Sequence, residues 1–225
     1  MSSAARPSGE GSPLGTDRDE AFTRAAVRSM FAAVARRYDF LNHFLSLGRD
    51  IAWRRATARA LKDVLAQPGS RVADLCCGTG DLSFCLGRLS QGLVMGADFC
   101  LPMLAIARGK KRAPSRRIYF LEADALHLPF ADASLDAVTS AFGFRNLAHY
   151  GQGIEEMRRV LKGGGRLAIL EFSHVRGHVF GPLFRFYFHH ILPCLGKWIS
   201  GVEGPYSYLP DSVAQFPDQE ALAEK

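Results

Sequence analysis

A short segment that ends in two glycines carries residues suited to binding a nucleoside. The segment Val72–Gly80 is an apolar run followed by a Gly-Thr-Gly turn. Glycines at such a turn let the backbone approach a ligand closely. Asp98 lies twenty residues after Gly78, at the end of the next apolar run, where a carboxylate accepts hydrogen bonds from both ribose hydroxyls. The two glycines alone are equally typical of a structural turn, and Asp98 is what favours a binding site.

The acidic residues around this turn indicate which nucleoside it binds. Ser83 is small enough to admit the pyrophosphate of a dinucleotide. However, Asp81 directly follows Gly80 at the start of the next predicted helix, and Asp74 adds a second negative charge. Carboxylates repel a pyrophosphate but attract an ammonium and a sulfonium. The pattern therefore favours S-adenosylmethionine over NAD as the cofactor.

Two further loops place polar residues at the same edge of the predicted sheet. Asp124 and Ala125 follow the third strand, and Asp124 suits either an adenine amino group or a cap on the next turn. The segment Ser140–Asn146 lies at the end of the fourth strand. Loops held by a rigid sheet often carry function, so both belong to the candidate site.

The elements that must position these residues alternate between strands and helices. Strands are predicted at Arg71–Cys76, Leu93–Asp98, Ile118–Glu122, Leu135–Ser140 and Arg166–Phe172. Helices are predicted between them at Asp81–Leu89, Leu101–Lys111 and Gly153–Leu161. This alternation predicts an α/β fold with a parallel sheet covered by helices on both faces. Ligands of such sheets bind beyond the carboxyl ends of the strands.

The composition is that of one globular domain behind a short tail. The chain has 225 residues, of which 48% are apolar and 22% charged, enough to bury a sizeable core. Residues 1–17 are small and polar and are expected to form a flexible tail. The domain, 18–225, is predicted to comprise a helical cap at 18–66, a cofactor-binding core at 70–175 and a substrate- or membrane-facing segment at 176–225. No stretch reaches the roughly 20 apolar residues that span a bilayer.

Charge and cysteine usage bear on partners and location. Residues 18–62 contain ten basic and four acidic side chains, which suits anionic lipid, nucleic acid or a solvated helix surface. No RNA-binding appendage accompanies them, so nucleic acid is not expected. Five cysteines without a Cys-x-x-Cys pair indicate reduced thiols in a cytoplasmic protein. His174 and His178 lack a second ligand pair, so no metal site is expected.

The sequence resembles the demethylmenaquinone and ubiquinone-precursor C-methyltransferases of quinone biosynthesis, within the Rossmann-like class I methyltransferases. The resemblance runs from about Ala26 to Phe216. Its distinctive segments are Tyr38–Asn42, Asp74–Leu82, Phe142–Asn146, Leu170–Ser173 and Tyr206–Val213. The glycine loop marks only the superfamily, whereas the Arg-Asn loop and the tyrosine-rich C-terminal segment together are specific to the family.

The resemblance implies a set of cofactor-binding residues. They are Asp74, Gly78, Thr79, Gly80, Asp98, Asp124, Ala125 and Ala141. Some relatives place a serine where Ala141 stands, and many place a glycine where Cys77 stands.

The resemblance also implies methylation of a ring carbon of a lipophilic quinol, ortho to a hydroxyl that has lost its proton. Arg145 would stabilise the phenolate or hold the water that accepts the proton; otherwise it forms a salt bridge with Asp39 or Asp136. Asn146 and Tyr38 would orient that water or the ring, although Tyr38 equally suits a core position.

An aromatic stretch, Phe180–Leu192, bears on the route of the lipophilic tail. It suits a tunnel for the tail, the membrane surface or the core of a helix. Together with the basic residues of 18–62 it predicts peripheral contact with the inner face of the membrane.

Relatives continue beyond Phe216 with a helix and two strands, whereas this chain stops at Lys225. We therefore expect a sheet of five strands instead of seven, without the C-terminal strand pair and with one unprotected edge. Such a loss would lower stability, favour a homodimer or abolish activity. The alternative to an active enzyme is a non-catalytic relative that binds S-adenosylmethionine or a quinone without turnover.

Overall fold

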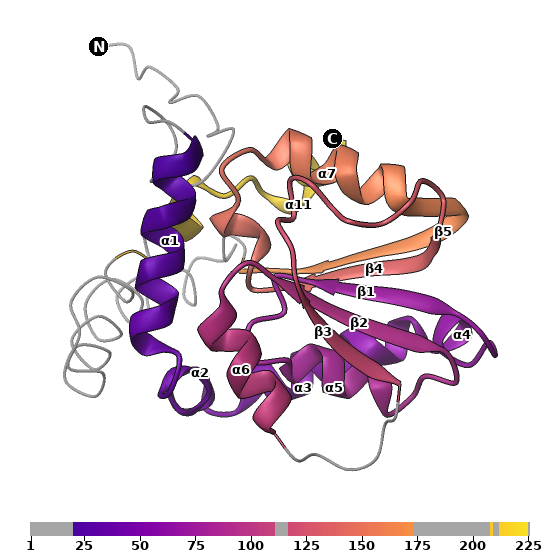
Figure 1. The fold of residues 1–225 in the computed structure, drawn as a ribbon, viewed down its shortest axis with the longest axis horizontal. Helices are drawn as coiled ribbons and strands as arrows, with labels where there is room; N and C mark the ends of the chain where they lie inside the picture. Colours follow the sequence, from indigo (N-terminus) through magenta and orange to yellow (C-terminus); the bar gives the residue numbers. More distant parts are fainter. Residues whose placement is uncertain (1–19, 111–116, 173–207, 209–211, 225) are drawn as a thin grey trace, which may run out of the picture.

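The five predicted strands pair in parallel in one sheet (Figure 1). The structure is a computed structural model that describes residues 20–110, 117–172, 208 and 212–224. The strands are β1 (Arg71–Leu75), β2 (Leu93–Asp98), β3 (Ile118–Glu122), β4 (Leu135–Ala141) and β5 (Leu161–Leu170). Their order across the sheet is β3-β2-β1-β4-β5, so β1 lies at the centre with β2 on one side and β4 on the other. The expected fold class is confirmed.

Alternate residues of β1 contribute to two separate hydrophobic cores. Val72 packs in a cluster with Leu82 and Leu86, on one face of the sheet. Ala73 and Leu75 belong to the larger cluster on the opposite face. Since both faces are covered, every residue of β1 after Arg71 is buried, instead of every second one.

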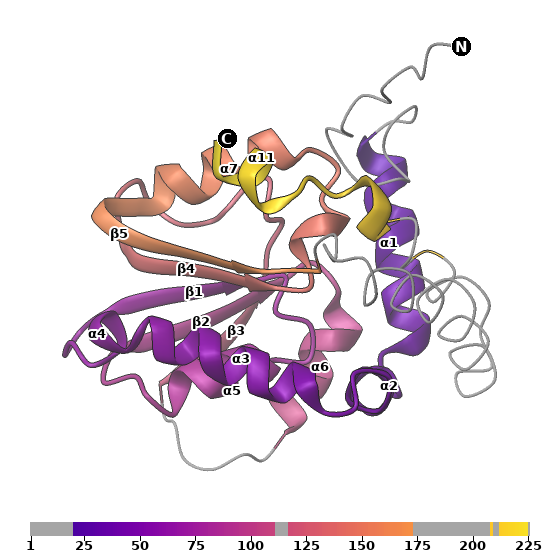
Figure 2. The same cartoon turned by 180° about the vertical axis from the view of Figure 1, so that it is seen from behind.

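Helices cover the two faces as a second and a third layer (Figure 2). One face carries α3 (Arg49–Ala60), α4 (Lys62–Leu65), α5 (Asp81–Gly87) and α6 (Leu101–Gly109). The other face carries α7 (Tyr150–Val160), and α11 (Gln219–Glu224) lies on the same side. Thus α3 and α4, which the sequence placed in an N-terminal cap, pack against the sheet layer through Ala58, Leu61 and Leu65.

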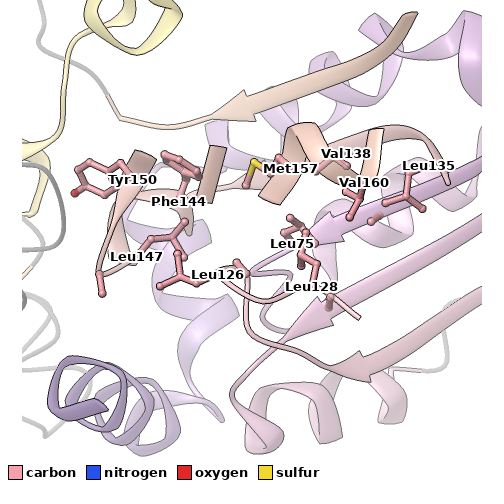
Figure 3. Packing of buried hydrophobic residues seen from close by; sticks show 14 of the residues in the cluster. Leu75, Leu126, Leu128, Leu135, Val138, Phe144, Leu147, Tyr150, Met157 and Val160 are labelled. Atoms are coloured by element: carbon pink, nitrogen blue, oxygen red, sulfur yellow. The ribbon is translucent and has the colours of Figure 1, made fainter. Parts of the chain in front are cut away.

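The larger core extends from the sheet to the loop after β4 (Figure 3). Phe144 stacks on Tyr150 with ring centroids 5.7 Å apart, and Phe216 meets both rings edge-on. The Tyr150 hydroxyl donates a hydrogen bond to the backbone oxygen of Arg145 at 2.9 Å. Helix α7 and the C-terminal segment therefore hold the loop that carries the Arg-Asn pair.

The N-terminal helices stand across the carboxyl ends of the strands (Figure 1). Helix α1 (Glu20–Val34) leads through a helical knee at residues 35–37 into α2 (Tyr38–Leu45), within the helical cap predicted at 18–66. Leu47 and Gly48 then adopt positive φ angles of 52° and 73°, which turn the chain into α3. Ala35 packs on Met103 of α6, so the knee is attached to the sheet layer at this point.

Element boundaries differ from the prediction mainly in β5. The strand begins at Leu161, not at Arg166, because the glycine run joins the ladder as a bulge. Leu135 pairs with Leu161, but Ala137 already pairs with Arg166, so extra residues of β5 bulge out between the two pairs. Helix α7 begins at Tyr150, three residues before the predicted start.

Several predictions concern residues outside the described ranges. These include the aromatic stretch Phe180–Leu192 and the histidines His174 and His178. Within the described ranges the sheet has the five expected strands, and no helix there is long and apolar enough to cross a membrane.

Gly143 gives a test of how the two central loops pack. A Cβ at Gly143 would lie 2.4 Å from the Cβ of Cys76, so Gly143→Ala forces the loops after β1 and β4 apart. We expect the free energy of unfolding in urea to fall by about 1–3 kcal/mol. The matched control is Gly151→Ala in α7, where a Cβ meets nothing within 4 Å and helix propensity favours alanine by about 0.5–1 kcal/mol. Equal stability of the two variants would contradict the packing described here.

Candidate active site

Three adjoining pockets follow the carboxyl ends of β1, β2 and β4. The apolar pocket is lined by residues that include Leu75, Ala97, Asp124, Ala125 and Leu126. The central pocket is lined by residues that include Phe31, Tyr38, Met103, Phe142 and Asn146. The polar pocket is lined by residues that include Arg54, Asp74, Thr79, Asp81 and Ala141.

Shared residues make one continuous crevice of these pockets. Cys76 lines all three. Asp98 and Asn146 line both the apolar and the central pocket. Tyr38 and Gly78 line both the central and the polar pocket. The residues predicted from separate loops are therefore brought together at the edge of the sheet where β1 separates β2 from β4.

Asp98 fixes the glycine loop to the end of β2. Its Oδ2 accepts a hydrogen bond from the Gly78 N–H at 2.8 Å, and its Oδ1 accepts one from the Cys100 N–H at 2.8 Å. Burial raises the pKa of Asp98, and the backbone N–H donors partly offset that effect. Each carboxylate oxygen has a second lone pair, so Asp98 retains the capacity to accept hydrogen bonds from a ligand.

The glycine loop depends on residues in the left-handed region. Cys76, Gly78 and Gly80 have φ angles of 52°, 56° and 83°. Gly80 lines none of the three pockets; a Cβ there would lie 2.8 Å from the Phe120 ring, so this glycine serves the turn and its packing. A non-glycine residue such as Cys76 at positive φ is uncommon, and such strain gathers at functional sites.

Asp74 lies behind the polar pocket and is fully buried. Its oxygens accept hydrogen bonds from the Ser83 hydroxyl at 2.6 Å and the Thr139 hydroxyl at 2.9 Å. Burial raises the pKa of Asp74 to about 6, although both hydroxyls lower it. Asp74 thus connects β1 to α5 and β4, and Ser83 is engaged in this connection.

A lysine neutralises part of the acidic charge at the loop. Lys110 Nζ lies 2.9 Å from Asp81 Oδ1 and 2.7 Å from Asp39 Oδ2. Asp39 in turn accepts a hydrogen bond from the Thr79 hydroxyl. The charge of Asp81 is therefore weaker than the sequence argument assumed, and α2 is attached to the glycine loop through this network.

Asp124 caps the turn after β3 and also faces the apolar pocket. Its Oδ1 accepts a hydrogen bond from the Leu126 N–H at 3.0 Å. Ala125 follows it along the pocket wall, and Ala141 lies at the end of β4 beside the polar pocket. The other carboxylate oxygen, Oδ2, lies 4.0 Å from His127 Nδ1. The cap is therefore one role that the structure shows, and the contact with adenine stays a prediction.

Arg145 is buried and forms an ion pair with Glu171. Its Nη1 donates to Glu171 Oε1 at 2.6 Å and to the backbone oxygen of Phe142 at 2.5 Å, and its backbone N–H donates to Glu171 Oε2 at 3.1 Å. The Arg145 and Glu171 side chains are 7% and 4% exposed. The predicted salt bridge exists, but its partner is Glu171 and not Asp39 or Asp136. This partner depends on the tertiary structure. Because β5 pairs with β4, Glu171, which follows β5, lies beside the loop that follows β4.

Tyr38, at the start of α2, and Asn146, in the loop after β4, both line the central pocket. Burial raises the pKa of Tyr38, although the charge of Arg145 and a hydrogen bond with the Asn42 side chain lower it. Asn146 Oδ1 is buried and has no hydrogen-bond partner among the described residues. A buried acceptor without a partner is costly unless a ligand or water satisfies it.

Cys76 is the one side chain common to all three pockets, and it is a free thiol. Burial raises its pKa well above the ordinary range, and the charges of Asp98 and Asp74 raise it further. The thiol is therefore protonated at neutral pH.

Comparison with known proteins decides the family. The model of the ubiE/COQ5 methyltransferase family matches residues 18–225. The chain belongs to this family. The demethylmenaquinone methyltransferase of Deinococcus radiodurans is 50% identical over 213 residues, which cover 94% of this chain and 86% of the relative. The enzyme of the same name from Thermus thermophilus is 52% identical over 194 residues, 86% of this chain and 87% of the relative.

Solved structures share the fold of this methyltransferase. The [4+2]-cyclase SpnF is 28% identical, with a TM-score of 0.50 over 55% of this chain and 46% of that one. An Anabaena variabilis protein from an antibiotic biosynthesis pathway gives a TM-score of 0.54 at 18% identity, over 74% of this chain and 57% of its own. Because one of these is a cyclase, the fold does not fix the reaction. Family membership does, and the chain is an S-adenosylmethionine-dependent methyltransferase, as the sequence predicted.

The crevice of this methyltransferase fits that cofactor. The apolar pocket suits an adenine ring, and Asp98 stands where a ribose would follow. The polar pocket, at the other end, suits the charged amino-acid end of the molecule. In the described ranges no group of three or more His, Cys, Asp or Glu side chains could hold a metal ion.

Three charged residues of this methyltransferase were not assigned a role from the sequence. Glu171 directly follows β5, at the carboxyl edge of the sheet. A carboxylate at that edge is a sequence signal that could have identified Glu171 as a site residue. Arg54 follows Asp50 by one helical turn, which is an ion-pair spacing. Lys110 had no signal, because its partners Asp39 and Asp81 are distant in sequence.

The raised pKa of Asp74 predicts how stability depends on pH. The ordinary value is 3.8 and the folded value is about 6, so folding favours the protonated form. This contribution to the free energy of unfolding is present below about pH 4 and is lost as the pH rises through about 6. Asp74→Asn stays neutral, so we expect wild-type stability relative to this variant to fall by about 2–3 kcal/mol between pH 4 and pH 7. Urea unfolding at several pH values measures it.

Asp136 provides the control of opposite sign. Burial would raise the pKa of Asp136, but hydrogen bonds from Lys162 and from the Arg71 N–H hold it below the ordinary value. Relative to Asp136→Asn, wild-type stability should therefore rise with pH over the acidic range. If the difference in the free energy of unfolding between the wild type and Asp74→Asn does not change with pH, the raised pKa of a buried Asp74 is wrong.

Proposed function

We propose that this methyltransferase transfers the methyl group of S-adenosylmethionine to a ring carbon of demethylmenaquinol, a lipophilic quinol. The observation that carries the proposal is the similarity, at 50% and 52% identity over most of both chains, to two enzymes named demethylmenaquinone methyltransferase. A relative from Geobacter sulfurreducens, 44% identical, is named for both ubiquinone and menaquinone biosynthesis. The naphthoquinol is therefore our first candidate, and the benzoquinol precursor of ubiquinone is the second.

In this proposal the crevice holds the cofactor in an extended orientation. Asp98 accepts hydrogen bonds from the ribose hydroxyls, while Asp124 and Ala125 contact the adenine in the apolar pocket. The backbone of Gly78 and the side chain of Thr79 lie beside the amino-acid end. When bound, the cofactor supplies an electrophilic methyl sulfonium.

Asp74, Gly80 and Ala141 have supporting roles in the proposal. Asp74 and Gly80 maintain the shape of the glycine loop, through the Ser83 hydrogen bond and the positive φ angle respectively. Ala141 closes the polar pocket at the end of β4.

The substrate ring would lie in the central pocket between Tyr38 and Asn146. The ring becomes a carbon nucleophile when its hydroxyl loses a proton, and water accepts that proton. Asn146 Oδ1 is an acceptor without a partner in the described part of the chain, and it can hold this water or the hydroxyl itself. Tyr38 lines the same pocket, and in this proposal its hydroxyl orients the same groups.

Arg145 lines none of the three pockets, so we assign it an indirect role. Its guanidinium is fixed by Glu171 and by the Phe142 backbone oxygen, next to Asn146 in the same short helical turn. The buried positive charge favours an anion in the neighbouring pocket, which is the charge that develops on the quinol oxygen. Glu171 limits this effect by neutralising part of the charge.

The first experiment is methyl transfer from labelled S-adenosylmethionine to an equal mixture of reduced demethylmenaquinol and the benzoquinol precursor. We expect label in the naphthoquinol product. Label in the benzoquinol alone would change the substrate assignment. No label, with binding of S-adenosylhomocysteine confirmed in the same sample, would favour the non-catalytic alternative.

Tyr38→Phe tests the central pocket in the same assay. The change removes only the hydroxyl, so we expect kcat to fall by at least about tenfold while affinity for S-adenosylhomocysteine changes by less than about threefold. Tyr119→Phe on β3, where the side chain is 59% exposed, is the matched control and should retain full activity. Full activity of Tyr38→Phe would remove Tyr38 from the catalytic residues.

We also propose peripheral contact with the cytoplasmic face of an anionic membrane, through α2. Phe40 and Phe44 stack with centroids 5.9 Å apart on its outer surface, and they are 60% and 47% exposed. Leu47 is 85% exposed at the end of the helix. Exposed Arg36 and Arg37 precede the helix, so an apolar patch adjoins basic side chains. This combination is typical of helices that lie in the interface of an anionic bilayer.

Vesicle flotation tests this contact. With vesicles of phosphatidylglycerol and phosphatidylcholine, we expect the double variant Phe40→Ser/Phe44→Ser to bind at least about tenfold more weakly than the wild type. Leu89→Ser, which replaces a 39% exposed leucine at the end of α5, is the control and should bind normally. Flotation of the double variant equal to that of the wild type would exclude α2 as the contact.

A further inference from the structure

The polar pocket contains a single cation among the described residues that line it. That cation is Arg54 of α3, which is only 6% exposed. The remaining polar lining consists of the carboxylates of Asp74 and Asp81, the hydroxyls of Tyr38 and Thr79 and the thiols of Cys76 and Cys77, together with the backbone of the glycine loop. A nearly buried arginine that opens onto a pocket is a strong candidate for binding an anionic group.

The orientation of Arg54 is fixed from two sides. Its Nη1 pairs with Asp50, one helical turn earlier. Its guanidinium carbon lies 5.2 Å from the centre of the Phe142 ring, within cation–π distance. The side chain is therefore held in place before any ligand arrives.

Asp50 neutralises Arg54 only in part, because it serves three donors. It accepts hydrogen bonds from His43 Nδ1 at 2.7 Å and from the Ser46 hydroxyl at 2.7 Å in addition to the Arg54 contact. A guanidinium has five N–H donors, and the carboxylate of Asp50 is its only acidic partner among the described residues. Arg54 keeps the charge and the donors to bind a second carboxylate.

The acidic wall of the same pocket has the complementary chemistry. Asp81 lines the pocket, and together with Asp39, which does not line it, Asp81 holds an ammonium, the Nζ of Lys110. The pocket therefore presents a cation from α3 and carboxylates from α5 and β1. A ligand end with one negative and one positive group matches this distribution, whereas a pyrophosphate, with negative charge alone, does not.

We propose that Arg54 binds the α-carboxylate of the amino-acid end of S-adenosylmethionine, with Asp81 on the side of the α-ammonium. The proposal rests on the use of this cofactor and adds the residue that recognises its carboxylate. It also assigns Arg54 a function inside the crevice, whereas the sequence alone placed Arg54 among the basic side chains of residues 18–62.

Ligands that differ only in the amino-acid end test the proposal by isothermal titration calorimetry. S-adenosylhomocysteine has the carboxylate and the ammonium, its decarboxylated analogue lacks only the carboxylate, and 5′-methylthioadenosine lacks both. We expect the full-length wild-type protein to bind S-adenosylhomocysteine about 10- to 100-fold more tightly than the decarboxylated analogue. This is the gain in affinity that charge-assisted hydrogen bonds between Arg54 and a carboxylate provide. Equal affinity for these two ligands would overturn the proposal without any variant.

The variant Arg54→Met keeps a long side chain and removes the charge. We expect it to lose about 10- to 100-fold in affinity for S-adenosylhomocysteine and less than about threefold for the decarboxylated analogue and 5′-methylthioadenosine. Arg59→Met, an exposed arginine on the same helix, should leave all three affinities unchanged. An equal loss for all three ligands would show that Arg54 only supports the fold of the pocket, and it would overturn the proposal.

The same titrations separate this proposal from the cofactor assignment. If the wild-type protein binds none of the three ligands, the use of S-adenosylmethionine itself is wrong and the role of Arg54 falls with it. If it binds all three with equal affinity, the cofactor assignment stands and only the role of Arg54 is lost.

Discussion

All five strands run in the same direction, and the arrangement of the crevice depends on that constraint. Parallel strands place every strand-to-helix turn at one edge of the sheet, so loops far apart in sequence meet there. β1 is the pivot, because it pairs with β2 on one side and with β4 on the other. The glycine loop therefore lies between Asp98 and the loop Ala141–Asn146, and Gly143 allows the two loops after β1 and β4 to touch.

Two aspartates at this edge show how position separates residues of one chemical type. Asp74 lies within β1, where hydroxyl groups surround it, and it connects three elements of the core. Asp98 lies at the end of β2, where backbone N–H groups hold it and the crevice remains accessible. The first supports the loop from behind, and the second is placed to contact a ligand. Two positions along the sheet make this difference, because Asp74 pairs with Gly96.

Much of the fold could be predicted because it depends on local pattern. Strand positions followed from apolar runs, and Asp98, Asp124 and Asn146 followed from their places at strand ends. Ion-pair partners could not be predicted, since they depend on which strands are neighbours. Glu171 reaches Arg145 only because β5 pairs with β4. For the same reason the start of β5 was misplaced, as a bulge is defined by the partner strand and not by the glycines alone.

The buried thiol of Cys76 has a consequence for the fidelity of the enzyme. It borders all three pockets, so a sulfur nucleophile stands within the crevice that receives an activated methyl group. Thiolates are far better nucleophiles than thiols. Burial and the neighbouring carboxylates raise the pKa of Cys76, which favours the protonated thiol, the weaker nucleophile. Cys77, a second free thiol, borders the polar pocket, and burial and the same carboxylates raise its pKa as well. The acidic surroundings thus favour a cationic cofactor and also favour the less nucleophilic, protonated form of both thiols.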